Sequence, residues 1–214
     1  DGEIMQAVLS KEVTFEGHYD PFTLYRALRL INPSPYMYFM NLGDFNIIGA
    51  SPEILVQSKQ GKVTIRPIAG TRKRGINSSE DLLNKIDLIE DDKEKAEHMM
   101  LVDLARNDLS KVSTVGSVNV DEMMIVEKYS HVMHMTSNVI GQKKDESTAI
   151  DCMKAALPAG TLSGAPKIRA MEILAEQENR ARGVYGGAVG YIGYNQTMDT
   201  AIVIRTALHN DASV

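Results

Sequence analysis

A succession of short apolar runs that gives way to a long segment of helical spacing constrains the fold of this chain most. The runs cover residues 36–41, 45–50, 54–58 and 62–68, and turn residues such as Gly or Pro separate them. This pattern predicts an antiparallel meander. From residue 80 to residue 108 the apolar spacing becomes that of a helix, and either one broken helix or two would fit it.

The second half of the chain mixes the same two patterns. Residues 115–120 and 132–140 have strand-like spacing, and strand-like spacing returns at 184–194 and 200–207. Helical spacing covers 147–157, with Ser147 as its cap, and 167–178. Long separations between strands argue against a simple βαβ sheet, and no repeat or linker marks a boundary. A mixed α and β fold in one domain, residues 1–214, is therefore expected.

The amino-acid composition limits the classes of molecule that this chain is expected to bind. With 214 residues and 43% hydrophobic content the chain can bury a core, and its net charge of -5 gives no general attraction for nucleic acid or acidic membrane. Cys152 is the only cysteine, so no internal disulfide can form. No apolar run approaches membrane-spanning length, and the first residues lack a signal peptide's basic start. We expect a cytoplasmic protein without nucleic-acid or membrane partners, and a piece of something longer, because it starts without methionine.

Residues 157–167 place a Gly/Ser/Thr-rich loop directly before a helix. Pro166 suits the first helical position, where its missing N–H would have had no partner. Free backbone N–H groups and the helix dipole favour a carboxylate or phosphate in front of such a loop. An ordinary capped helix is the alternative.

Two carboxylates, those of Glu94 and Glu97, lie three residues apart and so share one helix face. Lys93 and Lys95 lie nearby, as on an ordinary solvated face. If the face is turned into a cleft, its oxygen ligands suit Mg²⁺, which binds one or two carboxylates plus substrate oxygens and water.

His131 and His134 have the spacing of a helical metal pair, but their segment alternates like a strand and would point them to opposite faces. A zinc site is therefore rejected, and an acid/base role for one of them stays open beside a structural role. Arg205, within the apolar run 201–207, must be paired or poised for a carboxylate. Residues 67–72 could offer N–H groups to an anion.

Taken together, these segments resemble the chorismate-utilising enzymes, most closely the branch that makes anthranilate. The residues that carry the resemblance are 4–6, 32–37, 49–53, 67–72, 96–108, 157–167 and 185–191. The resemblance implies an α+β fold with two packed antiparallel-rich β-sheets flanked by helices. It also implies a Mg²⁺-dependent lyase that aminates chorismate with ammonia and eliminates pyruvate, in the first step of tryptophan biosynthesis. The expected partners are a glutamine amidotransferase subunit that supplies the ammonia, and tryptophan as feedback inhibitor.

The resemblance assigns roles to individual residues. Glu97 is the expected Mg²⁺ ligand, with Glu94 nearby through water. Substrate contacts are implied for Gly70, Thr71, Tyr185 and Arg205. Catalytic positions are Glu53, which protonates the departing hydroxyl, His134, Thr161 and Gln6. The tryptophan site is expected at Pro35, Tyr36, Met37, Val189 and Tyr191.

Two positions discriminate within the family. Gln6 stands where isochorismate and salicylate synthases are expected to carry a water-activating lysine, so ammonia is the implied nucleophile. Ala69 stands where aminodeoxychorismate synthase usually has a lysine that forms a covalent intermediate. Aminodeoxychorismate synthase and an inactive tryptophan-binding fragment remain the alternatives. The chain stops before the family's glycine-rich loop and second metal-binding glutamate, so we hypothesise that this polypeptide alone is inactive.

Overall fold

The computed structural model describes residues 2–210 of the chain. In chain order its elements are β1 (Gln6–Ala7), α1 (Pro21–Ile31), β2 (Tyr36–Asn41), β3 (Asn46–Ser51), β4 (Ile54–Lys59), β5 (Lys62–Ile65), β6 (Ile68–Lys73), α2 (Ser78–Glu90), α3 (Asp92–Ser110), β7 (Asn119–Lys128), β8 (Val132–Gln142), α4 (Ala149–Ala156), α5 (Gly160–Ser163), β9 (Gly164–Ala165), α6 (Lys167–Gln177), β10 (Ala188–Ile192), β11 (Met198–Ile202) and β12 (Thr206–His209). The mixed α+β prediction is confirmed.

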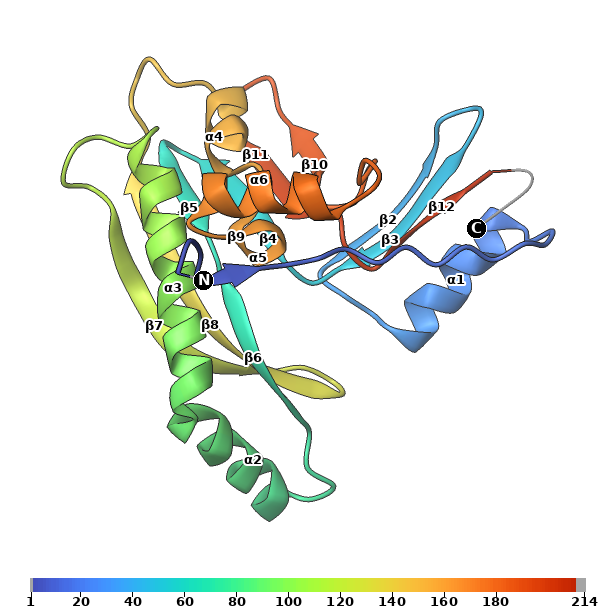
Figure 1. Ribbon diagram of the computed structural model, residues 1–214, viewed down its shortest axis with the longest axis horizontal. Coiled ribbons are helices and arrows are strands. Elements are labelled where there is room, and N and C mark those ends of the chain that lie inside the picture. Colours follow the sequence, from blue (N-terminus) through green and yellow to red (C-terminus); the bar gives the residue numbers. More distant parts are fainter. Residues whose placement is uncertain (1, 211–214) are drawn as a thin grey trace.

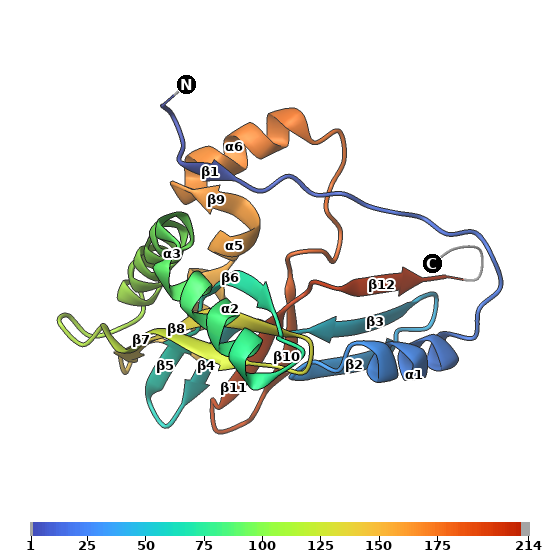
Figure 2. The same ribbon diagram turned by 90° about the horizontal axis from the view of Figure 1, so that it is seen from below.

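Antiparallel sheets organise the molecule (Figure 1). The large sheet has the order β10-β11-β4-β5-β8-β6, with β7 also paired to β8. A smaller sheet, β12-β3-β2, lies to one side with α1, and β1 pairs with β9. Helices α3 and α4 pack on the large sheet, whereas α6 lies beside the β1 and β9 pair, as Figure 2 shows for α6. Within residues 2–210 no helix is long and apolar enough to cross a bilayer.

The predicted meander is wrong in its pairing, although its strands are real. Strands β2 and β3 pair in the small sheet, whereas β4 and β5 pair in the large one. The chain leaves one sheet for the other at Pro52, which has no N–H to donate to a continuous ladder. Pro67 likewise ends the predicted run 62–68, and residues 68–73 form a separate strand, β6, beside β8.

The helical segment 80–108 is two helices, α2 and α3. Asp91 separates them and caps α3, because its side chain accepts hydrogen bonds from the backbone N–H groups of Lys93 and Glu94. The predicted cap Ser147 is wrong. Thr148 caps α4 because Asp151 lies three residues further on and completes a capping box.

Three predicted strands have different limits. Residues 114–117 form a turn in which the Ser117 N–H donates to the Thr114 carbonyl, so β7 starts at residue 119 and not at 115. Of 184–194, only 188–192 is strand. The run 200–207 is divided between β11 and β12, and Arg205 lies at the break with φ +51°. Arg205 is therefore not inside a strand, and its side chain is exposed.

The main core lies between the large sheet and helices α3 and α4. Its members are Leu55, Val56, Val63, Val102, Ala105, Leu109, Val112, Val139, Ala149, Cys152, Ala156, Ala159, Leu162, Met198 and Ile202. Cys152 is 1% exposed, as its place on an apolar helix face predicts.

One histidine is fully buried beside this core. His98 of α3 is 0% exposed, and its Nε2 lies 2.6 Å from Ser137 Oγ on β8. Its Nδ1 has no hydrogen-bond partner within residues 2–210. Burial lowers the pKa of His98 from 6.5 to about 4, because a charged imidazole would be poorly solvated there.

We expect this buried imidazole to make the fold sensitive to acid. The unfolded chain takes up a proton at His98 below pH 6.5 whereas the folded chain resists it, so stability falls as the pH drops from 6.5 to about 4. The full loss is about 3 kcal/mol. Urea unfolding of the wild type and of His98→Gln between pH 7.5 and 4.5 checks this. The variant should lose the pH-dependent component, and exposed His131→Gln should retain it. Equal pH dependence in wild type and His98→Gln would contradict the assignment.

Candidate functional site

One face of α3 organises the candidate site. Leu101, Leu104, Ala105 and Asp108 line a cavity, and Glu94 and Glu97 continue the same face toward the helix N-terminus at steps of three and four residues. Leu101 and Ala105 are buried, whereas Leu104 and both glutamates are half-buried. Glu94 and Glu97 thus share one face of α3, as the sequence predicts, and both side chains are partly exposed to solvent.

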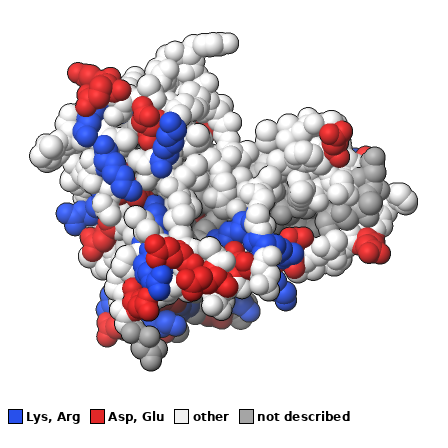
Figure 3. Space-filling model, turned by 45° about the horizontal axis from the view of Figure 1, so that its top comes forward, with Lys and Arg blue, Asp and Glu red and all other residues white. Residues whose placement is uncertain are grey.

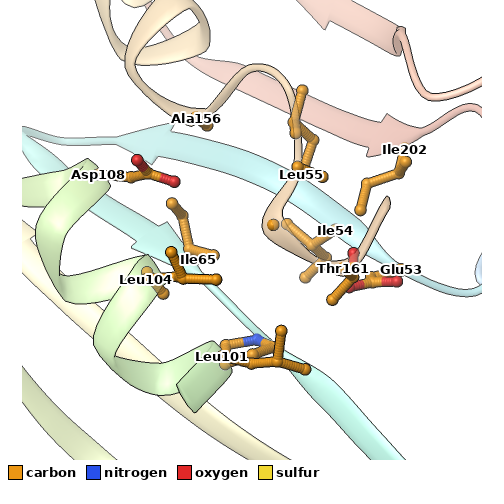
Figure 4. Close-up of a pocket in the computed structure, with 14 residues that line it drawn as sticks. Glu53, Ile54, Leu55, Ile65, Leu101, Leu104, Asp108, Ala156, Thr161 and Ile202 are labelled. Atoms are coloured by element: carbon orange, nitrogen blue, oxygen red, sulfur yellow. The ribbon is translucent and has the colours of Figure 1, made fainter. Parts of the chain in front are cut away.

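The cavity has a volume of about 30 Å³ (Figure 4). Its lining residues are Glu53, Ile54, Leu55, Ile65, Pro67, Leu101, Leu104, Ala105, Asp108, Ala156, Ala159, Gly160, Thr161 and Ile202. Figure 4 shows Glu53 and Thr161 side by side, across the cavity from the α3 residues. A volume of this size holds roughly one water-sized group, and no ring.

Glu53 is the buried acid of the site. It follows Pro52 at the crossing between the two sheets, and its carbonyl accepts the N–H of Ile202 at 3.0 Å. Its side chain is 8% exposed, and burial raises the pKa of Glu53 from 4.5 to about 7, although Thr161 and Arg205 oppose the rise. The Thr161 hydroxyl is close enough to the Glu53 carboxyl to affect its pKa, but it does not meet the geometry of a hydrogen bond. Within residues 2–210 this hydroxyl has no other partner.

His134 lies on β8 opposite Thr71 of β6. Its Nδ1 is 2.9 Å from Thr71 Oγ1 and 3.2 Å from the Gly70 carbonyl oxygen. Burial lowers the pKa of His134, and the charge of Arg205 adds to this effect. The charge of Arg205 thus acts on both groups, because it opposes the rise in the pKa of Glu53 and adds to the fall in the pKa of His134. His131 is exposed and lies in the turn before β8, so it is not in the strand that the sequence pattern predicted for it.

Gly70 brings the strand close to α3. Its φ is +72°, and a Cβ there would lie 2.8 Å from Leu88 Cδ1 and 3.2 Å from Glu94 Oε2. Glycine is required because a side chain would be strained and would press on Leu88. The Glu94 carboxylate consequently lies beside the Gly70-Thr71 segment. Its Oε1 accepts a hydrogen bond from Arg72 Nη1 at 3.3 Å.

Glu97 has a different neighbour, Gln6. Gln6 Nε2 donates to Glu97 Oε1 at 3.1 Å, whereas Gln6 Oε1 is buried without a partner in the described part of the chain. The pairing of β1 with β9, with Gln6 opposite Ala165, carries this residue to α3. No local pattern around residue 6 could have revealed this contact.

The loop 157–167 is more structured than predicted. It contains α5 and β9, and Pro166 is the residue before the helix and not its first member. Lys167, the positively charged residue of this segment, forms an ion pair with Asp108, with Nζ 2.5 Å from Oδ2. Burial lowers the pKa of Lys167. Thr161 reaches the cavity, but the predicted anion site in front of the helix stays a prediction.

The residues fit a metal ion only in a limited way. Within residues 2–210 no group of three or more His, Cys, Asp or Glu side chains could hold one. Glu94 and Glu97 offer two half-buried carboxylates at helical spacing, and Mg²⁺ commonly uses one or two carboxylates with substrate oxygens and water completing the shell. This donor set fits such an ion and would suit a closed structural site poorly.

Two of the predicted tryptophan contacts, Tyr36 and Tyr191, share the neighbour Asp199 where the small sheet meets the large one. Tyr36 Oη donates to Asp199 Oδ1 at 2.8 Å, and Gln57 Nε2 donates to both groups. Tyr191 on β10 pairs with Asp199, and Val189 lies on the same strand. Burial and Asp199 raise the pKa of Tyr36. Pro35 and Met37 flank Tyr36 in the chain. Sequence reasoning missed Gln57 and Asp199, whose partners are distant in the chain.

Tyr185 is held beside α5. The guanidinium of Arg182 lies 5.7 Å from the centre of the Tyr185 ring and donates to the carbonyls of Leu162 and Val8. The cavity itself is lined by Glu53 and Thr161, while Glu97, Thr71 and Arg205 are not among its lining residues. Convergence of those three on one ligand therefore stays a prediction.

The whole chain, residues 1–214, matches the family described as chorismate binding enzyme. It is 58% identical over 207 residues to anthranilate synthase component 1 of Pseudomonas aeruginosa, covering 97% of this chain and 42% of that protein. The crystal structure of anthranilate synthase component I from Streptococcus pneumoniae has a TM-score of 0.91 at 50% identity, covering 100% of this chain and 47% of the other. The structure of a menaquinone-specific isochorismate synthase from Escherichia coli is 21% identical and has a TM-score of 0.87. The match covers 100% of this chain and 50% of that protein's chain, and it shows that the two share a fold. The chain thus spans half or less of the length of these proteins, and it belongs to the chorismate binding enzyme family.

Proposed function

We propose that this chain supplies the chorismate site of an anthranilate-forming lyase, component 1 of an anthranilate synthase. The identities of 58% and 56% to component 1 proteins of two Pseudomonas species support this assignment. The observation that carries it is Glu53, a buried carboxyl whose pKa is raised to about 7 beside Thr161 and Arg205. Such a group is protonated in good part at neutral pH and can act as a general acid.

The reaction consumes chorismate and ammonia and releases water, pyruvate and anthranilate. Ammonia forms a C–N bond to the ring while the allylic hydroxyl departs, and elimination of pyruvate then leaves the aromatic product. Glu53 gives its proton to the departing hydroxyl, so that the leaving group is water. The cavity beside Glu53, of about 30 Å³, has room for that water.

The remaining site residues hold the substrate. Arg205 pairs with a carboxylate of chorismate, because its guanidinium is exposed and its positive charge acts on Glu53 and His134. Mg²⁺, when bound, supplies a Lewis-acid anchor for a substrate carboxylate, with Glu97 as its direct ligand and Glu94 through water. Gly70, Thr71 and Tyr185 contact the ring substituents.

The nucleophile is ammonia supplied by a glutamine amidotransferase subunit. Gln6 lies on Glu97 at 3.1 Å and has no basic nitrogen, so it cannot deprotonate water as a lysine could. Ala69 offers no amine for a covalent intermediate. Anthranilate is thereby favoured over aminodeoxychorismate. Tryptophan is the proposed inhibitor at Tyr36, Tyr191 and their neighbours.

A chimera tests the proposal directly. The 207 residues of this chain that match the Pseudomonas aeruginosa relative replace the corresponding part of that protein, and the purified hybrid is assayed with chorismate, Mg²⁺ and ammonium. Anthranilate fluorescence is the expected result, with Glu53→Gln abolishing it. A folded hybrid that forms 4-amino-4-deoxychorismate, or that binds tryptophan but turns over no chorismate, would refute the proposal in favour of one of the two alternatives.

A further inference from the structure

Arg72 connects the proposed substrate strand to the acidic junction of α2 and α3. Its Nε lies 2.5 Å from Asp87 Oδ2, its Nη2 2.8 Å from Asp91 Oδ2, and its Nη1 3.3 Å from Glu94 Oε1. Nη1 also donates to the carbonyl of Thr71 at 3.1 Å. Figures 1 and 2 show α2 and the start of α3 alongside β6, where these contacts occur.

The three ion pairs differ in character. Asp87 and Asp91 hold the guanidinium at hydrogen-bond distance, and Asp91 is itself fixed as the cap of α3. The contact with Glu94 is the longest of the three and is half-buried, with side chains 23% and 24% exposed. Arg72 can therefore give up Glu94 without moving, because its other two partners keep it in place.

The two carboxylate oxygens of Glu94 have different neighbours. Its Oε1 faces the guanidinium, while its Oε2 lies against Gly70, next to the Thr71 and His134 pair. A divalent cation approaching Glu94 would meet a fixed positive charge on one side. Repulsion at this range is substantial in a partly desolvated site.

We propose that Arg72 is a built-in counter-ion that competes with Mg²⁺ for Glu94, so that Mg²⁺ binds tightly only when a substrate carboxylate adds its own oxygens. This inference rests on the proposed function for the roles of Glu94 and Glu97. Arg72 acts through Glu94 and is a positioning residue, which touches neither chorismate nor the reacting atoms. Opposite charges are interspersed in this way over the face of the molecule in Figure 3.

Calorimetry with Mg²⁺ alone, on the full chain without chorismate, tests the inference. Arg72→Met should bind Mg²⁺ about tenfold more tightly than the wild type, since a unit positive charge next to the ligand is removed. Arg72→Lys keeps the charge and should remain close to the wild type. Arg72→Gln retains hydrogen-bond donors for Asp87 and Asp91, and it replaces the Met variant if that variant unfolds. Unchanged or weaker Mg²⁺ binding in a folded neutral variant overturns the proposal.

Two further variants exclude simpler explanations. Arg66 is an ion-paired arginine of similar exposure, 28%, that bonds Glu122 and Glu127 away from this junction, so Arg66→Met should leave Mg²⁺ affinity unchanged. In the double variant Arg72→Met, Glu94→Gln the gain should disappear. If it persists, the ion binds the uncovered aspartates and the inference is wrong. Failure of the chimera to form anthranilate refutes the proposed function separately, because that assay does not involve Arg72 variants.

Discussion

Replacing Glu53 with glutamine should raise the free energy of unfolding by about 3 kcal/mol at pH 8, while it abolishes proton donation. The folded-state pKa of Glu53 is raised to about 7 from 4.5, so the folded chain holds the proton more tightly than the unfolded chain does. The cost of ionisation is therefore absent below pH 4.5, grows as the pH rises to about 7, and is complete above it. A neutral amide avoids this cost at every pH.

Thermal and urea unfolding of wild type and Glu53→Gln between pH 4 and 8.5 measures the effect. The stabilities should converge at pH 4 and diverge as the pH rises. Glu146→Gln, which changes an exposed carboxylate, should shift stability little at any pH. A Glu53→Gln protein that is no more stable than the wild type at pH 8 would show that Glu53 is well solvated, and the proposed general acid would lose its basis.

Replacing Lys167 with methionine should destabilise the fold by roughly 3–5 kcal/mol, because it leaves a buried carboxylate without its main partner. Lys167 and Asp108 are 12% and 7% exposed and lie 2.5 Å apart. The remaining cation near Asp108, Lys111, is 52% exposed and cannot replace the buried contact. The pair fastens the start of α6, and with it the Thr161 segment, to α3.

Chemical denaturation of three variants separates the pair from its surroundings. Lys167→Met should show the large loss, and the double variant with Asp108→Asn should recover much of it, because no charge is then left buried. Lys111→Met should cost about 1 kcal/mol or less, as an exposed pair does. A loss of that small size in Lys167→Met would contradict the buried ion pair.

Local patterns in the sequence predicted the elements well. Strand β2 was placed at its observed limits, and the division of residues 80–108 into two helices was one of the two interpretations that the helical spacing allowed. The shared face of Glu94 and Glu97 follows from the same helical geometry. His134 lies in a strand as its alternating segment predicted, whereas His131 lies in the turn before that strand.

Long-range contacts could not be predicted in this way. Residue 6 reaches Glu97 only through the β1 and β9 pair, and Tyr36 meets Asp199 only because two sheets join there. Arg205 appeared to continue a strand, but the chain changes sheets at that point with a positive φ. Pairing between distant segments depends on which faces must be buried together, and one-dimensional spacing does not record that choice.

The central claim is that Glu97 and Arg205 together bind a magnesium-bound dicarboxylate. Calorimetric titration of chorismate into the full chain, with and without Mg²⁺, tests it most directly. We predict binding that requires Mg²⁺ and is lost in both Glu97→Gln and Arg205→Ala, while a stability measurement shows that both variants are folded. Chorismate binding that is indifferent to Mg²⁺ and to both substitutions, or binding of tryptophan but not of chorismate, would contradict the account.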